Sequence, residues 1–163
     1  MYLTGFMGTG KSTVGPALAR RLKRPFVDLD AAVEKAAGRS VAELFAREGE
    51  AGFRRRERAA LARASRRAGA VVALGGGTLL DARNRELVAR GVLVRLTCAR
   101  AKLARRLRPT RASRPKLAGG ALGARLRELA RLRRGACGAP DLTVSTTRRS
   151  PAQAAALIAR RLA

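Results

Sequence analysis

Residues 5–12 read GFMGTGKS, which matches the pattern G-x-x-x-x-G-K-[ST] of a phosphate-binding loop. Glycines let consecutive backbone N–H groups turn inward, and the helix that follows adds its positive end, so the loop suits the phosphates of ATP. Lys11 is expected to follow charge onto the transferred phosphoryl group, and the Ser12 hydroxyl is expected to bind Mg²⁺. The predicted ATP-binding residues of this loop are Gly8, Thr9, Gly10, Lys11, Ser12 and Thr13.

Two carboxylates follow at a spacing that suits acid–base and metal chemistry, in the segment FVDLD. If this segment is a strand, alternation points Asp28 and Asp30 to the same side, at the carboxyl end of the sheet where α/β proteins bind ligands. Asp28 can then organise the Mg²⁺ shell through water, and Asp30 can accept a proton from a substrate hydroxyl group. The alternative for Asp30 is that it caps the next helix.

The elements that must position these residues alternate between short apolar runs and helical patterns, which predicts an α/β fold with a parallel sheet. We expect one domain over residues 1–163, a three-layer αβα arrangement around five parallel strands. Strands are expected near 1–5, 25–29, 70–74, 92–97 and 142–146. Helices are expected over 11–23, 31–37, 40–48, 51–68, 81–89, 99–107, 121–134 and 151–162.

Local signals support several of these boundaries. Ser40 and Glu43 have the S-x-x-E spacing of a capping box, and Pro151 suits the first turn of the last helix. Pro16 falls about one turn into the first helix, where we expect a local bend. The segment 108–120, RPTRASRPKLAGG, fits neither period, and its prolines, glycines and arginines predict a mobile, basic lid. A plain surface connection is the alternative.

Composition narrows the function classes. The chain has 163 residues with a net charge of +25, 2 cysteines and no histidine, which excludes a disulfide framework, a histidine-based metal site and a Ser-His triad. The charge is mostly arginine spread along helices, so we expect solvated helix surface and no specific nucleic-acid partner. No signal peptide pattern or long apolar run is present, so we expect a cytoplasmic protein without membrane contact.

Taken together, the motifs GFMGTGKSTVG, DLD, GRSVAELFAREGEAGFRRRE, LGGGT and SRP occur in the order and spacing found in shikimate kinases, and the resemblance covers nearly the whole chain. The resemblance implies a P-loop kinase fold with a mobile lid. It also implies ATP-dependent phosphorylation of the 3-hydroxyl group of shikimate, the fifth step of the pathway to chorismate and the aromatic amino acids. ATP and Mg²⁺ are the implied cofactors, shikimate is the partner, and a monomer is expected.

The same resemblance assigns roles around the acceptor. The aspartate matching Asp30 contacts shikimate hydroxyls and is the favoured base, and the one matching Asp28 supports Mg²⁺. Arg54 binds the substrate carboxylate together with Arg133, since planar guanidinium groups grip carboxylates with paired hydrogen bonds. Glu57, three residues after Arg54, can hold that arginine in place.

Further roles fall on the lid, the glycines and the end of the chain. Arg114 of the SRP motif is expected to reach the bound phosphates when the lid closes. Arg149 and Pro151 are expected beside the adenine, and Arg106 is a candidate to stack on it. The glycine run after the strand at 70–74 is expected to bring the backbone close to the acceptor. The backbone N–H of Gly76 is expected to donate a hydrogen bond to a shikimate hydroxyl group. The run consists of Gly75, Gly76 and Gly77.

The chain also departs from the family pattern near Arg133. The family usually continues R-x-P-x-Y, whereas this chain has Gly135 and Cys137 in place of the proline and the tyrosine. Arg134 and Arg131 are therefore alternatives for the second carboxylate-binding arginine. Lys116 stands where an apolar residue commonly follows the R-P of the lid.

Two other functions remain as alternatives. One is another small-molecule kinase of the same fold, such as a gluconate kinase. Arg54 and the glycine run argue against it, because they suit a cyclic, carboxylated acceptor. The other is a basic nucleic-acid-binding or regulatory P-loop protein with little turnover.

Overall fold

The protein is built on one five-stranded sheet in which every pair of neighbouring strands is parallel, in the order β2-β3-β1-β4-β5. The computed structural model describes residues 1–109, 117, 119–132 and 138–162. The strands are β1 (Tyr2–Gly5), β2 (Phe26–Asp28), β3 (Val71–Ala73), β4 (Leu93–Thr97) and β5 (Leu142–Ser145). The predicted parallel sheet is confirmed, and each strand lies within its predicted range.

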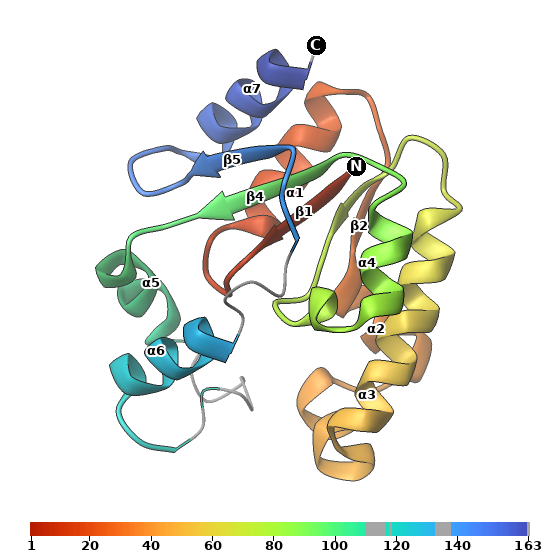
Figure 1. Cartoon of the computed structure of the whole chain (residues 1–163), viewed down its shortest axis with the longest axis vertical. Coiled ribbons are helices and arrows are strands. Elements are labelled where there is room, and N and C mark those ends of the chain that lie inside the picture. Colours follow the sequence, from red (N-terminus) through yellow and green to blue (C-terminus); the bar gives the residue numbers. More distant parts are fainter. Residues whose placement is uncertain (110–116, 118, 133–137, 163) are drawn as a thin grey trace.

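Helices connect the strands and cover the sheet (Figure 1). They are α1 (Lys11–Arg21), α2 (Leu29–Ala37), α3 (Val41–Ser65), the short 3₁₀ helix η1 (Thr78–Leu80), α4 (Ala82–Val88), α5 (Arg100–Leu107), α6 (Leu122–Leu132) and α7 (Pro151–Leu162). Pro151 is the first residue of α7, as expected for a residue that has no N–H to place. Among the described residues, no helix is long and apolar enough to cross a membrane.

The two faces of the sheet carry separate apolar cores. Side chains alternate along each strand, so that Tyr2 packs on one side with α2, α3 and α4, while Leu3 packs on the other side with α1 and α7. Val72 and Val71 divide between the two cores in the same way. Burial on both faces explains why these strands are almost continuously apolar, and it gives the three layers seen in Figure 1.

Beyond the carboxyl ends of the strands, α5 and α6 form a third, smaller cluster. Its buried residues include Leu103, Leu107 and Leu126, and Phe6 and Met7 of the phosphate loop pack against them. The loop therefore rests partly on the helices that flank the predicted lid. Most of the predicted lid segment, 108–120, lies outside the described residues.

Helix α3 contains a sharp break at Gly49, whose backbone (φ 66, ψ −175) is not helical. This is the boundary expected between helices over 40–48 and 51–68. The predicted capping box is present, because the Ser40 and Glu43 side chains each bond to the other's backbone N–H. At the break, Arg56 reaches back with Nε and Nη2 to the carboxylate of Glu48.

Candidate active site

The phosphate loop folds around the side chain that is expected to touch phosphate. Gly5, Gly8 and Gly10 have positive φ angles of 147°, 78° and 100°, which residues with a side chain rarely adopt. The Lys11 ammonium donates to the carbonyl oxygens of Gly5 at 2.8 Å and Phe6 at 3.2 Å. Lys11 thus lies across the loop, where an anion in the cradle would meet its charge.

Two side chains from distant elements hold the outer side of the same loop. Thr146 Oγ1, buried after β5, donates to the carbonyl oxygen of Thr9 at 2.8 Å. Arg106 Nη1, from α5, donates to the carbonyl oxygen of Gly8 at 2.9 Å. These two bonds fix the carbonyl groups of Gly8 and Thr9, and within the loop the Thr9 N–H donates to the carbonyl oxygen of Phe6 at 3.2 Å. In this structure the Arg106 guanidinium is bonded to the loop, a contact that the sequence did not predict.

Ser12 and Asp28 together form the candidate metal site. The Ser12 hydroxyl donates to Oδ2 of Asp28 at 2.7 Å, and Oδ1 of Asp28 accepts from the backbone N–H groups of Asp30 and Ala31. A hydroxyl and a carboxylate are hard oxygen ligands of the kind that Mg²⁺ prefers. Among the described residues no group of three or more His, Cys, Asp or Glu side chains forms a metal site, so phosphate and water would supply the remaining ligands.

The strand argument for Asp30 is wrong, although its place near Asp28 is retained. Strand β2 ends at Asp28, which is the N-cap of α2, so Asp30 lies in the first turn of that helix. The helix begins there because the Asp28 carboxylate satisfies its first free N–H groups. Asp28, and not Asp30, is therefore the capping residue.

Asp30 is a carboxyl group with an unusually high proton affinity. Desolvation, together with the negative charges of Asp28 and Glu57, raises its pKa from 3.8 to about 6, against an opposing effect of Lys11. Other atoms of the residue are exposed, but its Oδ1 lies close to the Gly75 backbone. A carboxylate of this kind is well matched to taking a proton near neutral pH.

Gly75 lies where two carboxylates and a hydroxyl converge. A Cβ atom at this position would come within 2.7 Å of Glu57 Oε1, 2.8 Å of Asp30 Oδ1 and 3.0 Å of Thr78 Oγ1. Thr78 Oγ1 donates to Glu57 Oε1 at 2.5 Å, and Glu57 has no exposed surface. The glycine therefore allows these side chains to close around the end of β3.

Arg54 lies on the other side of Glu57. Its Nη1 donates to Glu57 Oε2 at 2.5 Å, and its Nη2 donates to Glu50 Oε1 at 3.1 Å, which confirms the predicted pair with Glu57. Burial alone would lower the pKa of Arg54, but the charges and hydrogen bonds of Glu57 and Glu50 raise it. A Cβ atom on Gly77 would lie 2.5 Å from Arg54 Nη2, so this glycine also makes room for the guanidinium.

The remaining predicted residues are only partly described. Arg149 donates to the Ser145 carbonyl oxygen at 2.9 Å and lies on the exposed loop before α7. Gly76 is half-buried between the two close-packed glycines. Arg131 lies exposed in α6. Outside the described residues lie Arg114, Lys116, Arg133, Arg134, Gly135 and Cys137.

Sequence reasoning missed two residues of this arrangement. Thr78 directly follows the glycine run, and a hydroxyl residue at that position was a usable signal. Thr146 gave no local signal, because the sequence does not show that the end of β5 lies beside the phosphate loop.

Comparison with known proteins gives one consistent result. Residues 7–163 match the family model described as shikimate kinase. The shikimate kinase of Synechococcus sp. (strain RCC307) is 44% identical over 145 residues, which are 89% of this chain and 74% of that protein. For three other shikimate kinases the match spans between 42% and 52% of their own length.

Solved structures agree with the family match. A shikimate kinase from Acinetobacter baumannii in complex with shikimate superposes with a TM-score of 0.94 at 34% identity, covering 99% of this chain and 90% of that chain. A gluconokinase from Sinorhizobium meliloti superposes with a TM-score of only 0.60 at 20% identity, covering 99% of this chain and 93% of that chain. The second likeness reflects the shared fold alone.

Proposed function

The chain belongs to the shikimate kinase family, the kinases of the shikimate pathway of aromatic amino acid biosynthesis, and we propose that it transfers the γ-phosphoryl group of ATP to the 3-hydroxyl group of shikimate. The observation that carries this proposal is the cluster around Gly75. There a carboxyl group with a pKa of about 6 lies beside Glu57, which holds an arginine suited to an acceptor carboxylate.

In the proposed reaction the triphosphate lies in the loop 5–12. Its phosphates accept hydrogen bonds from the backbone N–H groups of Gly8, Thr9 and Gly10 and from Lys11, while Ser12 and Thr13 lie in the first turn of α1. Ser12 and Asp28 would hold Mg²⁺, which neutralises charge on the phosphate oxygens when bound. Arg149 is proposed beside the adenine.

Asp30 is the proposed general base. The 3-hydroxyl oxygen of shikimate forms a bond to the γ-phosphorus, the bond from that phosphorus to the β,γ-bridging oxygen breaks, and ADP leaves. The hydroxyl proton goes to the Asp30 carboxylate, whose raised pKa makes it a better acceptor than an ordinary aspartate. Lys11 and Arg114 stabilise charge on the phosphoryl group during transfer.

Arg54 is the proposed anchor of the shikimate carboxylate. Its Nη1 and Nη2 atoms each make a bond to a glutamate, and its side chain is 20% exposed, so donor N–H groups remain for an acceptor. Arg133 is proposed as the second arginine, with Arg134 and Arg131 as alternatives. The N–H of Gly76, between two glycines packed against active-site side chains, is proposed to bind a shikimate hydroxyl group.

A coupled assay of ADP release tests the proposal, run with shikimate, with gluconate and without an acceptor. We expect turnover with shikimate alone, and turnover that is independent of shikimate would overturn the assignment. Asp30→Asn should retain ATP binding, measured by titration calorimetry, and lose most turnover. We also propose that the protein acts in the cytoplasm as a monomer, which size-exclusion chromatography with light scattering can test.

A further inference from the structure

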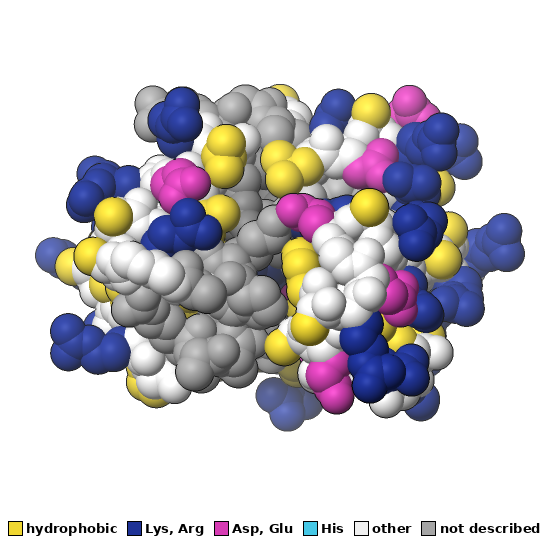
Figure 2. All heavy atoms as spheres, turned by 90° about the horizontal axis from the view of Figure 1, so that it is seen from below, with side chains coloured by type: hydrophobic (Ala, Val, Ile, Leu, Met, Phe, Trp, Pro, Cys, Tyr) yellow, Lys and Arg dark blue, Asp and Glu magenta, His cyan; other side chains and the backbone are white. Residues whose placement is uncertain are grey.

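The charges of this protein are divided unevenly between the two faces of its sheet. Of the 11 Asp and Glu residues, all except Glu128 and Asp141 lie between residues 28 and 86. That stretch forms α2, α3 and the start of α4, the layer on one face. In Figure 2 the acidic side chains accordingly gather on the half of the molecule that contains α3. Basic residues occur on both faces.

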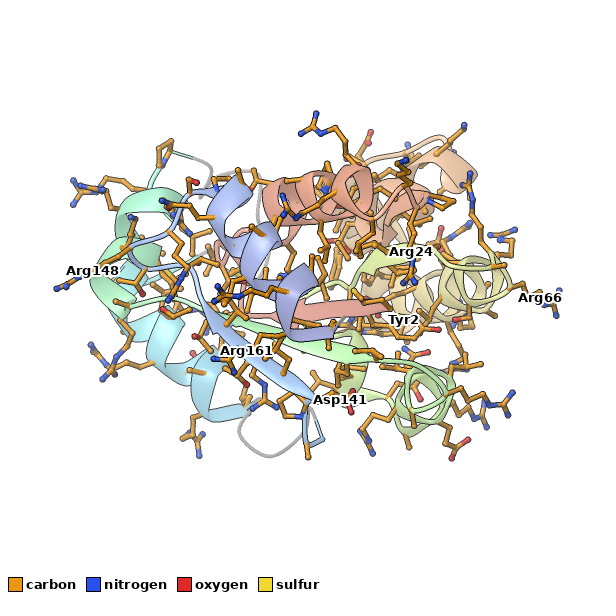
Figure 3. All side chains as sticks on the ribbon, turned by 90° about the horizontal axis from the view of Figure 1, so that it is seen from above. Tyr2, Arg24, Arg66, Asp141, Arg148 and Arg161 are labelled. Carbon is orange, nitrogen blue, oxygen red and sulfur yellow. The ribbon has the colours of Figure 1, made fainter. Side chains whose placement is uncertain are left out.

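The layer formed by α1 and α7 has no acidic residue at all. Residues 1–27 and 142–163, which include both helices, contain no Asp and no Glu. In Figure 3 the two helices lie side by side. Apart from Lys11 in the phosphate loop, its basic residues are Arg20, Arg21, Lys23, Arg24, Arg148, Arg149, Arg160 and Arg161, and all eight are exposed.

A groove runs along this surface. Four of the arginines line it, and its floor is apolar, from residues such as Leu22 and Leu157. The arginines of the groove are Arg21, Arg148, Arg149 and Arg160. Within the described part of the chain none of them forms an ion pair with a carboxylate, in contrast to Arg54, Arg56 and Arg58 on the other face.

Simple explanations account for only part of this pattern. Basic residues in the last turn of a helix complement the negative end of the helix dipole. This accounts for Arg20 and Arg21 at the end of α1 and for Arg160 and Arg161 at the end of α7. A coding bias toward arginine would account for a high arginine content throughout the chain. Neither explains why nine of the 11 carboxylates lie between residues 28 and 86, while residues 1–27 and 142–163 carry basic residues and no acidic ones.

We propose that seven of these basic residues, all except the Arg149 already assigned to the adenine, bind the sugar–phosphate backbone of nucleic acid without reading its bases. Guanidinium groups suit phosphate, and a field of one sign over two neighbouring helices suits a repeating polyanion. The large hydrophobic side chains exposed in the described residues are Leu80, Val92 and Leu132, none of them on α1 or α7. On the described parts of α1 and α7, therefore, no large hydrophobic side chain is exposed for insertion into a lipid surface, and no aromatic ring is exposed for bases to stack on.

The binding is separate from the proposed kinase reaction and is tested by fluorescence anisotropy with a labelled duplex of arbitrary sequence at several salt concentrations. We expect a Kd of about 10⁻⁶ to 10⁻⁴ M near physiological salt, weakening steeply as salt rises. The variant R20Q/R21Q/R160Q/R161Q should bind roughly tenfold more weakly or worse, and its salt slope should fall by about 0.9 for each phosphate that it no longer neutralises.

A matched control, R63Q/R66Q/R83Q/R90Q, removes the same charge from exposed positions of the α3/α4 layer. This variant should bind nearly as well as the unmodified protein, and both variants should still unfold in one cooperative thermal transition and keep their ADP release with shikimate. If the two variants bound the duplex equally weakly, binding would depend only on net charge, and the proposal would be overturned. So would the absence of duplex binding, or tighter binding to phosphatidylserine vesicles than to the duplex.

Discussion

Glu57 accepts a 2.5 Å hydrogen bond from Arg54 Nη1 and thereby connects the proposed carboxylate anchor to the interior of the protein. The Glu57 carboxylate has no exposed surface, and its other oxygen accepts from Thr78. A buried charge with these partners cannot move without leaving one of them unsatisfied. The orientation of Arg54, the proposed anchor, is therefore fixed by a carboxylate that has no exposed surface.

Glu57→Gln keeps the shape of this side chain and removes its charge. We expect the KM for shikimate to rise roughly tenfold or more and the free energy of unfolding to fall by about 1–3 kcal/mol, because Arg54 loses its buried partner. Steady-state kinetics and chemical denaturation measure both effects. Glu86→Gln, at an exposed position of α4, is the control and should change neither. An unchanged KM would show that Arg54 does not depend on Glu57.

The pKa of Asp30 predicts the pH dependence of activity. Because only the ionised carboxylate can accept a proton, kcat/KM should fall tenfold per pH unit below a pH of about 6. Glu57 contributes to the raised pKa of Asp30, so Glu57→Gln should move this limb of the profile to lower pH. A profile that stays flat down to pH 5 would argue against Asp30 as the base.

The same pKa predicts an effect on stability. The folded-state pKa of about 6 lies above the ordinary value of 3.8, so ionised Asp30 destabilises the fold above pH 6, and the penalty disappears as the pH falls from 6 to below 3.8. Asp30→Asn should therefore raise the free energy of unfolding at pH 8 by about 1 kcal/mol, a figure reduced for solvent screening, and have little effect at pH 3.5. Thermal denaturation at the two pH values measures the difference.

The glycines after β3 should differ in their sensitivity to an added methyl group. Gly75→Ala places Cβ against both Glu57 and Asp30, so we expect kcat to fall by about 10²-fold or more. Gly77→Ala places Cβ against the Arg54 guanidinium and should chiefly raise the KM for shikimate. Gly123→Ala in α6, whose Cβ would meet only Arg127 Nη1 at 3.7 Å, is the control and should be neutral or slightly stabilising. Equal effects of all three substitutions would contradict this explanation.

Thr146→Val tests whether the outer carbonyl bonds shape the phosphate loop. Valine keeps the volume but removes the donor to Thr9, and we expect the KM for ATP to rise several-fold, equivalent to about 1 kcal/mol, with a smaller change in the KM for shikimate. Thr143→Val, at an exposed position of β5, is the matched control. If both KM values shift together, the bond supports general stability and not the loop.

A double-mutant cycle on Glu48 and Arg56 tests the break in α3. The two side chains join the segments on either side of Gly49, and a Cβ atom on Gly52 would lie 2.4 Å from Glu48 Cβ, so the pair packs tightly over the helix. Both side chains are partly exposed to solvent, which screens the ion pair, so we expect only weak coupling between the two substitutions. Glu48→Gln and Arg56→Met should each raise the KM for shikimate about twofold, and the pair Arg125 and Glu128 on α6 serves as the control.

Most of the fold could be predicted because its signals are local. The apolar runs identified every strand to within two residues at each end, the capping box identified the start of α3, and the glycine at 49 separated two helical patterns. The error at Asp30 also has a local cause. An aspartate that caps a helix and one that ends a strand look alike in sequence, and the choice depended on where β2 stopped pairing with β3.

The sequence by itself determined the phosphate loop, the pair of Arg54 and Glu57 and the parallel sheet, because each depends on residues a few positions apart or on a repeating pattern. Only the tertiary structure decided what the glycines after β3 are packed against and which side chains hold the phosphate loop from outside. Thr146 and Thr9 are 137 positions apart, and Thr78 and Glu57 are 21 apart. Their contacts follow from the order in which strands pack in the sheet, which no short-range spacing encodes.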